Sequence, residues 1–145
     1  MNVLIEADRE RLLERLRVLR PDARPVAGTL TAPRMVCHIA DQIAVALGDI
    51  PSARQDTLMA RTLGKAFALY APIPIPFGRV KTVPEMLTSA PTDWNGDIAR
   101  VASLLTRVAD TDRFASHPAF GRLTRRQWGR LTANHLDHHL RQFGV

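Results

Sequence analysis

The sequence predicts an all-α protein, a four-helix bundle, and three observations support this fold class. Apolar residues recur at helical spacing in four long segments. No segment shows the apolar and polar alternation that is typical of a half-buried strand. A long proline-rich stretch separates the second helical segment from the third. With 145 residues, of which 46% are hydrophobic, the chain is long enough for one domain with its own core, so we expect a single bundle domain over residues 1–145.

The first two helices are predicted from their apolar stripes and their ends. Residues 3–20 have an apolar stripe that begins at Ile5, and prolines follow the segment. The second helix is expected to begin after Thr31, a suitable N-cap, with Pro33 in its first turn. It should end at Gly48, because glycine is the preferred residue just past a helix C-terminus.

The connection between the second and third long helices is expected to contain an additional helix and a crossover. Residues 55–70 have large apolar side chains at helical spacing, namely Met59, Leu63, Phe67 and Tyr70. Residues 71–84 contain four prolines. Prolines at alternate positions remove the backbone donors that a sheet requires, so we expect a crossover that can cover the mouth of a pocket.

Two further long helices complete the predicted bundle. Thr92 is expected to cap the third, which should end near Asp110. The last begins with Thr124 and has Gln127 three residues later. This is a capping-box pattern, in which the two residues satisfy each other's free backbone N–H groups.

Composition and charge disfavour several classes of function. The net charge of +6 would indicate nucleic-acid binding if it were clustered, but the 18 arginines are spread along the chain among acidic residues. No apolar run approaches the roughly 18 residues of a membrane span, and the first residues do not resemble a signal peptide, so we expect no membrane association and a cytoplasmic location. The only cysteine, Cys37, excludes an internal disulfide and is expected to be a small buried residue.

The candidate functional residues are histidines. Three of the five histidines lie within residues 135–139. On a helix, His135 and His139 lie one turn apart on one face, which is a suitable pair for a borderline divalent ion. His38 lies on the inward-facing apolar stripe of the second helix. In a bundle these three side chains can converge, so the sequence predicts a site for zinc, nickel or a similar divalent ion with positions left open for water or substrate.

Four other polar residues lie near the expected ligands on the same two helices. Gln42 and Gln142 can orient an imidazole, because a ligating histidine usually donates its second N–H group to a neighbour. His138 lies at the edge of the inward arc and would replace a ligand if the helix register differed. Asp41 is the only acidic residue near His38. His117, beside a proline in a connection, is expected to make structural hydrogen bonds.

The histidine pattern resembles a known superfamily. Asn-His-x-x-His-His-x-x-Gln, here residues 134–142, follows an isolated inward histidine on an early helix. This combination resembles the DinB-like superfamily of metal-binding four-helix bundles, and the order of elements is similar over nearly the whole chain. The resemblance is greatest to a branch of unknown function that contains His-Pro-x-Phe-Gly-x-Leu-Thr, here residues 117–124. Members of that branch end in His-x-x-His-His-Leu-x-Gln-Phe-Gly, here residues 135–144.

The resemblance implies a metal triad, an enzymatic class and an oligomeric state. Residue by residue, the metal ligands of the superfamily correspond to His38, His135 and His139. Some relatives are transferases or isomerases that use a low-molecular-weight thiol together with the metal, and relatives often pair through their helices. The implied function is therefore that of a metal- and thiol-dependent transferase, isomerase or hydrolase that acts on a small molecule, and a homodimer is one of the assemblies left open.

Two other functions remain open at this point. The first is a non-catalytic bundle, with or without a metal, that binds a small ligand or dimerises. The second is a basic DNA-associated protein, which only the charge and the name of the superfamily suggest. Histidines four residues apart are also common as plain core or surface residues. Metal content, activity and the salt dependence of any DNA binding distinguish these alternatives.

Overall fold

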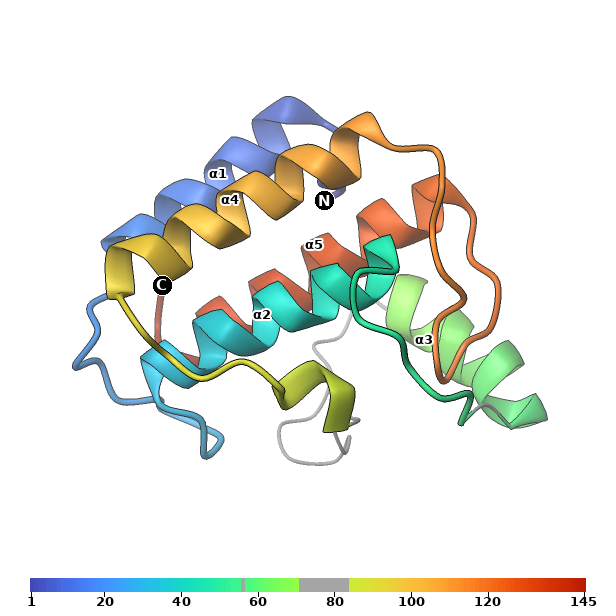
Figure 1. The fold of residues 1–145 in the computed structure, drawn as a ribbon, viewed down its shortest axis with the longest axis horizontal. Helices are drawn as coiled ribbons and strands as arrows, with labels where there is room; N and C mark the ends of the chain where they lie inside the picture. Colours follow the sequence, from blue (N-terminus) through green and yellow to red (C-terminus); the bar gives the residue numbers. More distant parts are fainter. Residues whose placement is uncertain (56, 71–83) are drawn as a thin grey trace.

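The computed structural model describes residues 1–55, 57–70 and 84–145 (Figure 1). Within these ranges the chain forms helices, turns and loops, and the only β-type pairing is an isolated bridge between His117 and Gly121. The predicted all-α class is therefore confirmed for the described residues. The four long helices are α1 (Glu6–Val18), α2 (Ala32–Leu47), α4 (Trp94–Asp110) and α5 (Arg125–Gln142).

The four long helices pack around a shared apolar core. Helix α2 contacts α4 and α5, and α1 contacts the same two helices. In Figure 1, α1 and α4 lie together above α2 and α5. The core includes fully buried leucines from α1, α4 and α5, and it includes most of α2. No helix among the described residues has both the length and the apolar character needed to cross a membrane.

The predicted limits of α2 and the predicted start of α5 are confirmed, although the Thr31 side chain makes no capping hydrogen bond. Helix α2 follows Thr31 and ends at Gly48, whose φ of 83° is left-handed and therefore favours glycine. At the start of α5, the Thr124 hydroxyl accepts from Gln127 N–H, and the Gln127 side chain accepts from Thr124 N–H. This is the predicted capping box. The predicted cap of α4 was wrong by one residue, because Asp93 rather than Thr92 accepts from the backbone N–H of Gly96.

The N-terminal segment differs from the prediction. Helix α1 begins at Glu6 rather than at residue 3, and Ile5, placed on the inward stripe, is 57% exposed. Val3 is fully buried instead, and its backbone N–H donates to Gly129 O at 3.1 Å. The chain therefore enters the core one turn before the helix begins, which helical spacing alone does not predict.

The additional helix is present between α2 and α4. A π-helical turn, Ala60–Gly64, continues into α3, Lys65–Tyr70. Its predicted apolar stripe is largely exposed, with Met59 and Leu63 at 71% and 72%, and the buried side chain is Leu69. The proline-rich crossover predicted for residues 71–84 lies outside the described residues up to residue 83. A short 3₁₀ helix that was not predicted, η2 (Pro84–Leu87), contacts α2.

Gly129 provides a test of the docking between the N-terminal segment and α5. A Cβ atom at this position would lie 2.6 Å from Leu4 Cγ and would overlap the Asn2 side chain. We expect Gly129→Ala to lower the free energy of unfolding by about 1–3 kcal/mol, because the segment must move away from α5. Urea denaturation measures this difference.

The matched control is Gly64→Ala, where a new Cβ atom meets nothing closer than 3.7 Å. It should leave stability unchanged or slightly raised, since alanine favours a helix more than glycine does. Equal stabilities for the two variants would show that the N-terminal segment does not depend on close approach to α5.

Candidate metal centre

Three histidine side chains converge between α2 and α5. His38 Nε2 lies 3.1 Å from His135 Nε2, which lies 3.2 Å from His139 Nε2. One ring nitrogen from each residue falls within a set whose members are all within 4.8 Å of one another. Two nitrogen ligands of one tetrahedral zinc ion, each about 2.0–2.1 Å from the metal, are about 3.4 Å apart. The spacing therefore suits a single small divalent ion.

Hydrogen bonds fix the orientation of two of the three rings. His38 Nδ1 lies 2.7 Å from the backbone oxygen of Met86, and His139 Nδ1 lies 2.7 Å from Gln142 Oε1. A carbonyl oxygen only accepts, so each Nδ1 donates its proton and each Nε2 keeps a lone pair. In both residues the nitrogen that faces the centre is thus the one free to bind a metal.

Burial keeps these imidazoles neutral. Burial and, to a smaller extent, the neighbouring His38 lower the pKa of His139 to about 3. Burial also lowers the pKa of His135 well below its ordinary value, with His139 and His38 contributing. The pKa of His38 is lowered by burial, against an opposing effect of its bond to Met86 O. Neutral imidazole is the form that binds a metal, so the centre needs no deprotonation at neutral pH.

The Asp41 side chain forms hydrogen bonds with residues other than the three histidines. Its fully buried carboxylate accepts from Ser89 N–H at 2.8 Å and from Thr88 Oγ1 at 3.2 Å, and it pairs with Arg100 at 3.3 Å. Burial alone would raise the pKa of Asp41, but these hydrogen bonds and the guanidinium together hold it below its usual range. The network ties the residues that follow η2 to α2, and Met86 on η2 is the residue whose oxygen orients His38.

The other predicted neighbours fall into three environments. Gln142 bonds to His139 as described, and Gly28 packs against its carboxamide, where an added Cβ atom would lie 3.1 Å from Nε2. The His138 ring centroid is 5.2 Å from that of His139, but His138 is not one of the three converging histidines. Gln42 is buried beside the centre on α2, and neither of its side-chain polar atoms has a hydrogen-bond partner among the described residues.

Sequence reasoning missed the Met86 carbonyl and the Ser89 anchor. Every residue has a backbone carbonyl, so no residue type signals which one will meet a histidine. A buried aspartate on an otherwise apolar stripe was the available signal for the anchor, because a buried carboxylate requires several donors. Asp41 was identified as a polar neighbour of His38, but its partners could not be named.

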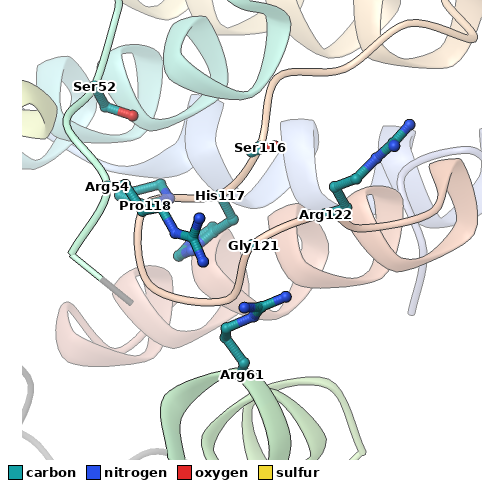
Figure 2. A pocket seen from close by; sticks show the side chains of 8 residues that line it. All are labelled: Ser52, Arg54, Arg61, Ser116, His117, Pro118, Gly121 and Arg122. Carbon is teal, nitrogen blue, oxygen red and sulfur yellow. The ribbon is translucent and has the colours of Figure 1, made fainter. Parts of the chain in front are cut away.

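A pocket lies on the loop around His117 and is lined by none of the three converging histidines (Figure 2). Its volume is about 310 Å³, and three arginines contribute to it. In Figure 2, Arg54 and Arg61 extend toward the loop from two different segments, whereas Arg122 points away. His117 Nδ1 accepts from the backbone N–H groups of Ala119 and Phe120, both at 3.1 Å. The predicted structural role of His117 is confirmed.

Comparison with known proteins gives one family. The family model described as "Protein of unknown function (DUF1569)" matches residues 7–144. The chain belongs to the DUF1569 family. The match runs from the second residue of α1 to beyond the end of α5 and includes the three converging histidines. No curated protein and no solved structure matches the chain.

The bond between Gln142 and His139 can be tested through metal affinity. We expect Gln142→Leu to weaken zinc binding about 10- to 100-fold, because His139 loses the acceptor that fixes its ring. Gln142→Glu keeps an acceptor oxygen at the same place and should bind zinc at least as tightly as the wild type. Competition with a chromophoric chelator measures both affinities. Equal weakening in the two variants would show that packing, rather than the hydrogen bond, is responsible.

His117 gives a prediction for pH dependence. Burial lowers its pKa to about 4, so between pH 6.5 and 4 the unfolded chain binds a proton that the folded chain does not. This contribution to stability is complete above pH 6.5 and is lost as the pH falls toward 4. His117→Asn keeps an acceptor for the loop but does not titrate. Between pH 7 and pH 5, the free energy of unfolding of this variant should fall by about 2 kcal/mol less than that of the wild type. Urea denaturation at the two pH values measures the difference. Parallel pH profiles would contradict this.

Proposed function

We propose that this DUF1569 protein binds one divalent metal ion, zinc, nickel or a similar ion, through His38, His135 and His139 and acts on a small molecule at that centre. The observation that supports the proposal is the convergence of three neutral imidazoles. Their Nε2 atoms are 3.1 and 3.2 Å apart in successive pairs, and two of the three rings are oriented through Nδ1. A cluster that served only to fill the core would not require this agreement of spacing, tautomer and charge.

The proposal includes a DinB-like four-helix bundle as the fold. It is supported by four long helices with a shared core and by an additional helix between the second and third of them. The position of the histidines, one on the second long helix and two on the last, agrees with the superfamily pattern. A cytoplasmic location and a homodimer belong to the same proposal.

The proposed chemistry is that of a metal- and thiol-dependent transferase, isomerase or hydrolase. Three protein ligands leave coordination positions open, whereas a structural site usually has four. A bound divalent ion would lower the pKa of a water or thiol and would polarise an electrophile. Cys37 is 2% exposed, and burial raises the pKa of its thiol. The thiol would therefore be a small molecule rather than a side chain of this protein.

Metal content tests the proposal directly. Untagged wild type, His38→Ala and His139→Ala are incubated with zinc, dialysed and measured by mass spectrometry, each with a circular dichroism melt. We expect about one ion per wild-type chain, and almost none in either variant, with helicity retained.

His138→Ala is the matched control, because it removes a neighbouring imidazole that is not one of the three converging histidines. It should keep the ion. If the wild type is as metal-free as the variants after dialysis, the three histidines are core residues and the proposal fails. If all the histidine variants lose the ion equally, the site does not have the proposed ligands.

A further inference from the structure

Two polar side chains beside the histidines are buried without hydrogen-bond partners. Gln42 is 3% exposed and Thr132 is 1% exposed. Within the described ranges, neither Gln42 Nε2, Gln42 Oε1 nor Thr132 Oγ1 has a partner, and the buried Nδ1 atom of His135 has none either. A buried polar group left in this state costs about 1–3 kcal/mol, and most such groups in folded proteins are satisfied.

Side chains of the same chemical kinds that are less buried find partners elsewhere in the protein. The hydroxyl of Thr106 on α4 donates back to Ala102 O at 3.2 Å, as threonines in helices commonly do. The carboxamide of Asn134 on α5 donates to Ala68 O at 3.1 Å. A position on these helices therefore does not prevent such side chains from forming hydrogen bonds. Gln42 and Thr132 instead share a location between α2 and α5.

The helix register places both side chains in one layer next to the histidines. Helices α2 and α5 run in opposite directions (Figure 1), and His38 faces His135. Gln42 is one turn beyond His38 on α2, and Thr132 is about one turn before His135 on α5. A further turn along both helices, Ala46 and Trp128 belong to one apolar cluster. The unpartnered atoms thus lie between the imidazoles and an apolar floor.

We propose that Gln42 and Thr132 bind a polar group of the small molecule on which the histidine centre acts. This inference rests on the proposed function and makes it more specific. A carboxamide has both N–H donors and an acceptor oxygen, and a hydroxyl both donates and accepts. The complementary ligand group also donates and accepts, and it is uncharged, because neither side chain that binds it is charged. A hydroxyl or a carboxamide on the substrate has this chemistry.

An ordered water has the same hydrogen-bonding capacity as such a group. The experiment therefore distinguishes a bound substrate group from a structural water. The probe is acetohydroxamate, a small metal-binding molecule with an N–H donor and two oxygens. Cobalt(II)-loaded wild type, Gln42→Leu and Thr132→Val are titrated with it, and visible absorbance reports both cobalt and hydroxamate binding. We expect unchanged cobalt affinity and about tenfold weaker hydroxamate binding in each variant, which corresponds to one lost hydrogen bond.

Asn134→Leu is the control, because it removes a carboxamide on α5 that already has a partner. It should bind hydroxamate like the wild type. Thermal melts of the metal-free proteins provide the second measurement. Gln42→Leu and Thr132→Val should melt at or above the wild-type temperature, since each removes an unsatisfied buried group, whereas Asn134→Leu should melt lower.

The unfavourable outcomes are distinct. Unchanged hydroxamate affinity together with lower melting temperatures means that a structural water satisfies Gln42 and Thr132, and it overturns the inference alone. Weaker cobalt binding in Gln42→Leu means that Gln42 contributes to the metal centre itself, as a ligand or by orienting an imidazole, which also overturns the inference. Failure of the wild type to bind cobalt overturns the proposed metal centre, and with it the inference that depends on it.

Discussion

The contact between α2 and α5 brings three neutral imidazoles together, and much of the surrounding structure depends on this constraint. Nε2 of His38 and Nε2 of His139 both direct lone pairs toward the third ring. Such an arrangement is unfavourable in an apolar core unless a proton or a cation lies between the nitrogens. Hydrogen bonds to Nδ1 hold two of the three rings, those of His38 and His139, in this geometry. Met86 O restrains the first, Gln142 Oε1 restrains the last, and the packing of α1 and α4 restrains the two helices.

The restraint on His38 comes from a part of the chain that has little secondary structure of its own. The Asp41 carboxylate binds Ser89, which follows η2, and Arg100 on α4, so it connects α2 to both segments. The buried charge of Asp41 thereby connects the packing of the helices with the orientation of His38, which lies one turn earlier on α2. This explains why a carboxylate is present on the most buried helix, where apolar residues would otherwise be expected.

The sequence predicted those features that depend on local patterns. The spacing of His135 and His139, the end of α2 at Gly48 and the capping box at Thr124 follow from rules that act within a few residues. The convergence of His38 with that pair followed from the bundle geometry assumed for the helices. What could not be predicted depended on tertiary contacts: the burial of Val3 instead of Ile5, the exposure of the stripe at Met59, and the identity of the Met86 carbonyl.

The wide separation of the histidines along the chain has a consequence for the order of events during biosynthesis. His38 and His135 are 97 positions apart, and Met86 comes from between them. A ribosome exposes His38 long before it synthesises α5, so no early fragment contains the complete centre. The complete set of three histidines therefore forms only after the last helix has docked. Selection of an ion by all three side chains together can begin only in the folded protein, because an emerging chain never presents more than part of the set.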